Sequence, residues 1–160
     1  MNRTLLAIYL NDHLAGATGG TTLARRLARN HRGTEMQGPT GDLADQIAQD
    51  RTALLQIMGA LGIRPRRVRL GLALLAERVG RLKFNGRLVR RSPLSSVIEL
   101  EAMRIGVEGK IDGWQALRRV ADRERRLDAH GLDELLHRAG QQSDTLQELR
   151  LRAVTAAFIG

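Results

Sequence analysis

The sequence predicts an all-α protein, an up-down bundle of four long helices with a crossover segment between the second and the third. Apolar residues recur at three- and four-residue spacing over long stretches, as on one face of an amphipathic helix. The alternation of apolar and polar residues that marks a half-buried strand is not found. The 160 residues, 42% of them hydrophobic, are enough for one domain with its own core, over 1–160.

Turn and capping residues divide the first half of the chain into two helices. The first helix is expected over 4–31, followed by a loop over 33–41 that is rich in Gly and Thr. Asp42 is a natural N-cap for the second helix, because its carboxylate can accept from the free N–H groups of the first turn. This helix should end near Leu61, before the Gly and Pro of 62–65, and should pack antiparallel to the first.

A basic connection and two further helices make up the second half. Within the connection, apolar residues at heptad spacing predict a short amphipathic crossover helix over 68–82. Ser92 and Pro93 suit an N-cap and the first helical position, so the third helix is expected over 93–126. Asp128 caps the fourth helix, which continues to the C-terminus. A long second connection between helix pairs is typical of a bundle with a crossover.

The positive charge is concentrated in this connection. The chain has 26 Lys and Arg against 17 Asp and Glu, a net charge of +9, and residues 64–91 hold ten of the bases and one acid. The rest of the chain is therefore balanced. Non-specific binding to nucleic acid or to an anionic lipid surface is one interpretation, through Arg64, Arg66, Arg67, Arg69, Arg90 and Arg91.

A solvated crossover is the interpretation we favour for this segment. Its apolar stripe would pack on the bundle, and its arginines would pair with acidic groups of the same or a neighbouring subunit. The chain has only four aromatic residues, too few for the stacking platforms of single-strand binders. Sequence-specific recognition is therefore not expected.

Composition excludes several classes of protein. The chain has no Cys, which excludes a disulfide framework and a thiolate nucleophile and fits a cytoplasmic protein. The N-terminus lacks a signal-peptide pattern, and the longest apolar run, 70–76, is far short of the roughly 20 residues that span a bilayer. No serine-hydrolase elbow or HExxH motif is present. A structural or interaction protein is expected rather than an enzyme.

Several polar residues lie on or near the apolar stripes of the predicted helices, at about 100° per residue. On the third helix, two glutamates fall among Leu94, Val97 and Ile105. Charged groups inside a bundle must be paired or bind metal, because isolated buried charges are too costly. The candidates for an inward polar network are Tyr9, Asp12, His13, Asp50, Arg51, Glu101, Arg104, Glu108 and Arg150.

The helix count, the long second connection and these carboxylates resemble the ferritin-like superfamily, including its stress-associated bacterial branch. That family binds two metal ions through a Glu on each of two helices and a Glu-x-x-His on each of the others. Ala53 stands where the histidine of the second helix should be, and the Glu134–His137 motif of the fourth faces outward. By resemblance, the ligands of an iron or manganese centre would come from Asp12, His13, Asp50, Glu101 and Glu108.

Three interpretations of the inward charges remain open. The favoured one is a buried network of carboxylates and arginines in place of the di-metal centre, without cofactor, since an inward arginine competes with a dication for the same carboxylates. The second is a working di-iron or di-manganese oxidoreductase. In the third, the charges sit at the stripe edges and reach water.

Glycines interrupt the first and third helices, where each costs up to about 1 kcal/mol relative to Ala. They are Gly16, Gly19 and Gly20 in the first and Gly106, Gly109 and Gly113 in the third. One explanation is a helix pair opened around a ligand. The favoured explanation is a close approach of two helix backbones. Trp114, on the same stretch, is expected in the core or at the contact of a homodimer.

Overall fold

A computed structural model describes residues 2–66 and 92–160 of the chain. Within these residues it contains four α-helices and no strand, which confirms the all-helical prediction. The predicted crossover helix over 68–82 lies outside the described residues. The helices are α1 (Arg3–Asn30), α2 (Gln37–Ala60), α4 (Pro93–Ala121) and α5 (Ala129–Phe158).

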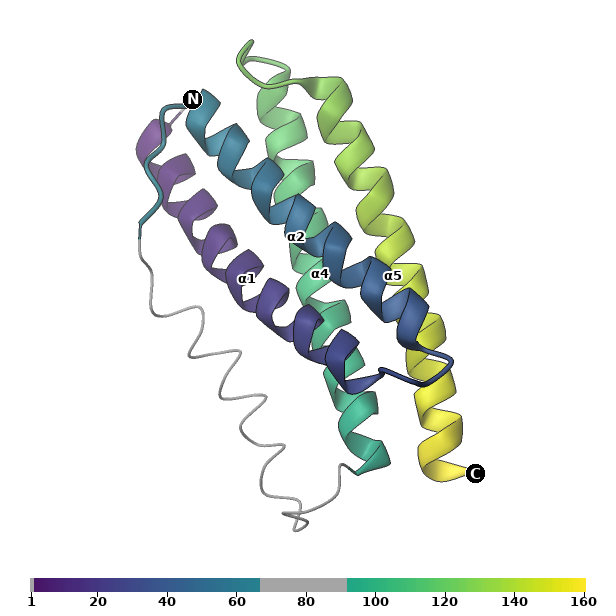
Figure 1. Cartoon of the computed structure of the whole chain (residues 1–160). Helices are drawn as coiled ribbons and strands as arrows, with labels where there is room; N and C mark the ends of the chain where they lie inside the picture. Colours follow the sequence, from purple (N-terminus) through teal and green to yellow (C-terminus); the bar gives the residue numbers. More distant parts are fainter. Residues whose placement is uncertain (1, 67–91) are drawn as a thin grey trace.

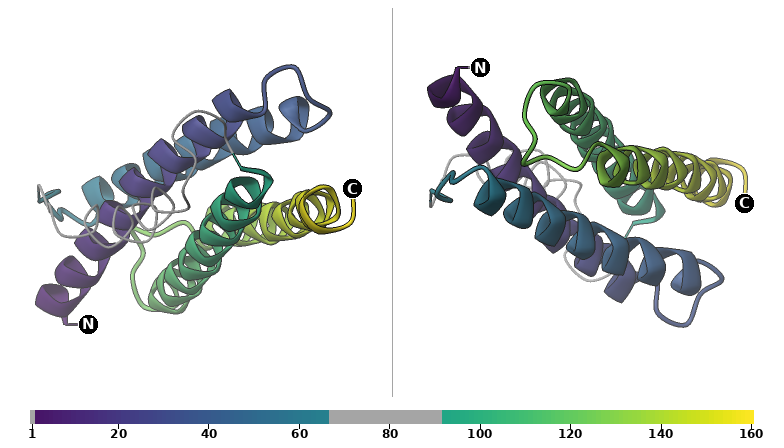
Figure 2. Two further views of the ribbon diagram at one scale, coloured as in Figure 1. Left: turned by 90° about the horizontal axis from the view of Figure 1, so that it is seen from below. Right: turned by 90° about the horizontal axis from the view of Figure 1, so that it is seen from above.

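Two antiparallel hairpins form the bundle (Figure 1). One consists of α1 and α2 and the other of α4 and α5, and views along the bundle show them as two layers (Figure 2). Packing between the layers is mainly that of α1 on α4, with a smaller contact between α2 and α5. The end of α2 and the start of α4 lie at opposite ends of the bundle, so α2 and α4 run in the same direction.

Several predicted helix ends are confirmed. Asp128 caps α5, its Oδ1 accepting from the backbone N–H of His130 at 3.0 Å. At the start of α4, Pro93 occupies the first turn as predicted. Beyond the ends of α1 and α2 the chain passes through Gly33 and Gly62 with φ of 75° and 68°, a conformation that favours glycine.

Two predicted boundaries are wrong. The start of α2 is Gln37 rather than Asp42, which lies within the helix and is exposed. Pro39 is tolerated in the first turn because the N–H groups there have no partner in the helix. The end of α4 is Ala121 rather than residue 126, because the chain turns to bury Leu127 in the core.

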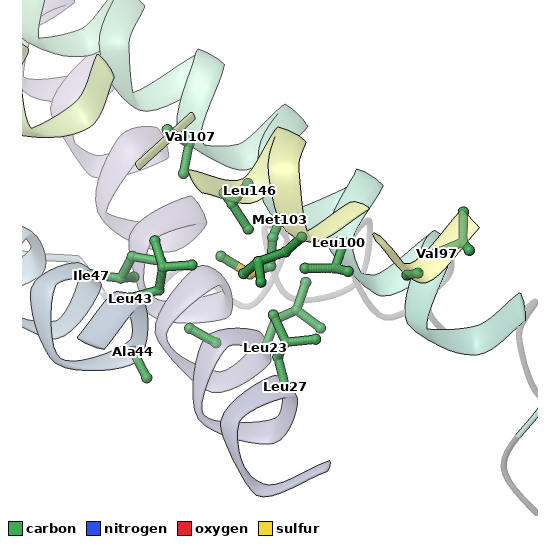
Figure 3. Close-up of a cluster of buried hydrophobic side chains, with 13 residues drawn as sticks. Leu23, Leu27, Leu43, Ala44, Ile47, Val97, Leu100, Met103, Val107 and Leu146 are labelled. Atoms are coloured by element: carbon green, nitrogen blue, oxygen red, sulfur yellow. The ribbon is translucent and has the colours of Figure 1, made fainter. Parts of the chain in front are cut away.

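Apolar side chains form two clusters along the bundle, and every helix contributes to both. The first contains Leu23, Leu43, Leu100 and Leu146 (Figure 3). The second, nearer the other end, is built by residues of α1 including Leu10 and Leu14, of α2 after Asp50, and of the region around the α4/α5 turn. A polar layer therefore crosses the middle of the bundle between two apolar regions.

Candidate functional site

Asp50 of α2 is the centre of the polar layer, with 2% of its surface exposed. Its Oδ2 accepts from Nζ of Lys110 on α4 at 2.5 Å and from Nε2 of Gln142 on α5 at 3.1 Å. The other oxygen, Oδ1, accepts from Nε of Arg138 at 2.9 Å and also from Nη2 of this guanidinium. Both oxygens of the buried carboxylate are thus hydrogen-bonded, as a charge in a low-dielectric interior requires.

Two cations share this one carboxylate. Lys110 also donates to Oε1 of Gln142, whose Nε2 donates to Oε1 of Gln46 at 3.1 Å. Burial lowers the pKa of Lys110, and the positive charge of Arg138 lowers it further, while Asp50 opposes both effects. We refer to Asp50, Lys110, Arg138 and Gln142 as the Asp50 cluster; it has more positive than negative charge.

The cations of the cluster are not those that the helical wheel indicated. Of the three arginines predicted to face the carboxylates, Arg51, Arg104 and Arg150, the last pairs with Glu101 as predicted. The cations that contact Asp50 are instead Lys110 and Arg138. The wheel of the third helix had been centred close to Ile105, which is 59% exposed. The correct face of α4 follows the buried residues Glu99, Met103, Val107 and Gly113–Trp114, and Lys110 lies on it.

The two glutamates predicted on this face lie elsewhere. Glu101 pairs with Arg150 of α5 at 2.9 Å, and the side chains are 43% and 29% exposed. Glu108 is exposed, and its Oε1 accepts from Oγ of Ser143 at 2.5 Å. Arg104 is half-buried, and its Nε has no partner among the residues that the structure describes.

A buried acid that the sequence analysis missed is Glu99, which is fully buried. Its Oε1 lies 2.7 Å from Nη2 of Arg26, and its Oε2 accepts from Nδ2 of Asn30 at 3.3 Å. The spacing of Glu99 from Met103 and Val107 is the signal that could have placed it on the inner face.

The candidate metal ligands do not converge. Nowhere in 2–66 and 92–160 do three or more His, Asp or Glu side chains lie close enough together to hold a metal ion. Asp50 is occupied by two cations, and Asp12 is exposed. Such a donor set does not fit a di-metal centre, because the cations already take up the carboxylate oxygens and repel a dication.

A cavity of about 490 Å³ lies between α1 and α4, with α2 at its floor. Glycines of both helices line it. Among the residues that the structure describes, a Cβ atom added to any of four would meet no neighbouring atom within 4 Å; these are Gly16, Gly20, Gly106 and Gly109. The favoured prediction of a close backbone approach is therefore wrong for these four. At Gly113, an added Cβ would lie 2.9 Å from Nδ1 of His13, so there the side chain of α1 takes up the space.

Apolar side chains make up most of both ends of the cavity, with Tyr9, Asp12 and His13 beside them at one end, and further charged side chains line its middle. One end is formed by residues of the second cluster, including Leu54 and Trp114, and the other by residues of the first, including Ile47 and Met103. Between them the lining contains Asp50, Arg51 and Lys110. The cavity thus spans the polar layer.

Arg51 is a cation of the cavity lining without a counter-charge. Its Nε donates to Oγ1 of Thr18 at 3.1 Å. In the described part of the chain, no carboxylate lies within 4.0 Å of its guanidinium. The prediction that Arg51 forms part of an ion-pair network with Asp50 is therefore wrong.

Tyr9 and His13 lie at the Trp114 end of the cavity. Their rings pack edge to face with centroids 4.4 Å apart, and the Tyr9 hydroxyl donates to the backbone oxygen of Asp112 at 3.5 Å. Burial lowers the pKa of His13, against the opposing charges of Asp112 and Asp12. Burial, followed by the charge of Asp112, raises the pKa of Tyr9. These residues close one end of the cavity around a weakly basic imidazole.

The basic residues of the predicted anion-binding segment are described only at its start. Arg64 and Arg66 are exposed, and Asn11 holds their backbone, accepting from the N–H of Arg66 at 2.5 Å. Arg67, Arg69, Arg90 and Arg91 lie outside the described residues. Of the helices described, none is long and apolar enough to cross a membrane.

Comparisons with protein-family models, with curated proteins and with solved structures found no match to this chain. The assignment of a function therefore depends on the geometry of the cavity and of the Asp50 cluster.

Proposed function

We propose that this protein binds a small molecule in the cavity between α1 and α4 and is not an enzyme. The observation that carries the proposal is the cavity itself, whose volume of about 490 Å³ falls within the roughly 300–1,000 Å³ of typical ligand pockets. Its lining is mostly apolar with a few charged groups, the usual composition of such pockets.

The glycines support a binding role. Four glycines border open space on two facing helices, where alanine would be accommodated and would favour the helix by up to about 1 kcal/mol per site. Close packing of the described helices does not explain them, since no atom of residues 2–66 or 92–160 lies within 4 Å of where their Cβ atoms would be. A ligand that occupies this space would account for their presence.

The proposed architecture is that of a ferritin-like bundle with the Asp50 cluster in place of the di-metal centre. Two observations support this: α2 and α4 run in the same direction between two antiparallel hairpins, and the cluster lies midway along the bundle with residues from three helices. Near-stoichiometric iron or manganese in the purified protein would contradict this assignment and favour a di-metal oxidoreductase.

The binding proposal is tested with a neutral fluorescent probe, N-phenyl-1-naphthylamine. Trp114, the only tryptophan, lines the cavity, so energy transfer from it to the probe reports binding there. We expect transfer in the native protein and its loss in Gly16→Leu and in Gly109→Leu, whose side chains would fill the cavity.

The matched control is Gly140→Leu. This glycine of α5 also has free space around its Cβ position but does not line the cavity. Transfer should persist in this variant, and far-UV circular dichroism should show the same helix content in all proteins. The proposal is wrong if Gly16→Leu and Gly109→Leu leave the transfer unchanged, or if neither this probe nor its sulfonate analogue binds the native protein.

A further inference from the structure

We infer that the ligand is an amphipathic anion: an apolar body that carries a carboxylate, sulfonate or phosphate group, with Arg51 as the anchor of that group. This inference rests on the proposed ligand-binding function and specifies the class of ligand. It is carried by the distribution of charge along the cavity.

The middle of the cavity has an excess of positive charge. Arg51 and Lys110 line it, and Arg138, which is not part of the lining, shares the carboxylate of Asp50 with Lys110, so this region holds three cations and the single negative charge of Asp50. Both oxygens of Asp50 are already used by Lys110 and Arg138. The described part of the chain leaves no negatively charged acceptor for Arg51, and an anionic group on a ligand would supply one.

The remaining carboxylate of the lining does not remove this excess. Asp12 is exposed and belongs to the Tyr9–His13 end of the cavity, where its negative charge acts to raise the pKa of His13. The guanidinium of Arg51 is instead oriented by Thr18, which lies about one and a half turns of helix after Asp12 on α1. The orienting hydroxyl uses only Nε and leaves the terminal N–H groups of Arg51 as donors.

The apolar ends of the cavity determine the rest of the ligand. Side chains such as Ile47 and Met103 on one side and Leu54 on the other offer no hydrogen bonds to a polar molecule. The polar groups of Tyr9, Asp12, His13 and Trp114 are confined to one end. A molecule that is charged throughout would lose its hydration there without compensation. An apolar body with one anionic group satisfies both parts of the lining.

Two probes with the same aromatic body separate the contribution of the ligand's charge to the affinity from the contribution of its apolar body. One is N-phenyl-1-naphthylamine and the other is its sulfonate, 1-anilinonaphthalene-8-sulfonate. We expect the native protein to bind the sulfonate about tenfold or more tightly than the neutral probe, since a charge-assisted hydrogen bond adds to the same apolar burial. Arg51→Gln should remove this preference, because it should weaken binding of the sulfonate far more than binding of the neutral probe.

Arg152→Gln is the matched control, because Arg152 is exposed on α5 and away from the cavity. It should retain the preference for the sulfonate. In the native protein, decanoate should also displace the neutral probe at about a tenfold lower concentration than decanol, a measurement that does not depend on any variant.

The outcomes separate the two proposals. Equal affinity for the two probes, or an equal loss of both in Arg51→Gln, would overturn the anionic class of the ligand while the binding function stands. Failure of both probes to bind the native protein would overturn the binding function itself. Tighter binding of decanol than of decanoate would also contradict the inference.

Discussion

Asp50 and Glu101 both form ion pairs between helices, and their surroundings differ completely. Asp50 is 2% exposed and is held by two cations and an amide from two other helices. Glu101 meets only Arg150, with 43% of its side chain exposed. Water reaches the carboxylate of the second pair but hardly that of the first, so the two pairs differ in how strongly solvent screens them.

The two groups of ion pairs also differ in which helices they connect. The Glu101–Arg150 pair joins α4 to α5, which are already packed along their length. The Asp50 cluster joins α2, from one layer of the bundle, to α4 and α5 in the other, and it lies beside the cavity. It therefore connects α2, at the floor of the cavity, directly to α4 in its wall.

Replacement of Asp50 by Asn should have the largest effect. It leaves Lys110 and Arg138 in the interior without a counter-charge, and breaking a buried pair in this way typically costs about 3–5 kcal/mol. We expect the free energy of unfolding, measured by urea denaturation, to fall by about 3 kcal/mol, since Arg138 is partly exposed and can reach water.

Asp45→Asn is the control for this variant, because Asp45 lies on the same helix and is exposed. Its free energy of unfolding should stay within about 0.5 kcal/mol of that of the native protein. A similar small change for Asp50→Asn would mean that the cluster is hydrated rather than buried, and the contrast with Glu101 would disappear.

The double variant Asp50→Asn/Lys110→Met should have an intermediate effect. Removal of the unpaired lysine takes away the main source of the instability, and buried ion pairs can be exchanged for apolar groups at little net cost. Urea denaturation should show a loss of about 1–2 kcal/mol relative to the native protein, a recovery from the single variant. Additive losses from the two substitutions would instead show that Lys110 stabilises the fold independently of Asp50.

The architecture was accessible from the sequence because it depends on local signals. The three-to-four-residue period, Asp128 and Pro93 fixed the number of helices and two of their starts. The errors occurred where tertiary packing prevailed, at the burial of Leu127 and at the uncapped start of α2 before Pro39. The helix wheel cannot detect either of these effects.

The candidate site was less accessible, for a related reason. The helical wheel correctly placed Asp50 on the inner face of its helix. The glycines were also singled out, because their cost to helix stability requires an explanation. The wheel did not give the rotation of α4, and so it selected Glu101 in place of Lys110. The cavity depends on the distance between two helices, and the spacing of apolar residues along one helix does not determine that distance.

Replacement of Glu101 by Gln should have the smallest effect. If this glutamate were buried in an ion-pair core, as the helical wheel of the sequence indicated, the loss would be a few kcal/mol. Because the pair with Arg150 is partly exposed, we expect a decrease in the free energy of unfolding of at most about 1 kcal/mol, reduced further by added salt. Glu148→Gln, an exposed position of α5, provides the baseline in the same urea titration. A loss as large as that of Asp50→Asn would show that solvent exposure does not distinguish the two carboxylates, and the argument for a special role of the Asp50 cluster beside the cavity would fail with it.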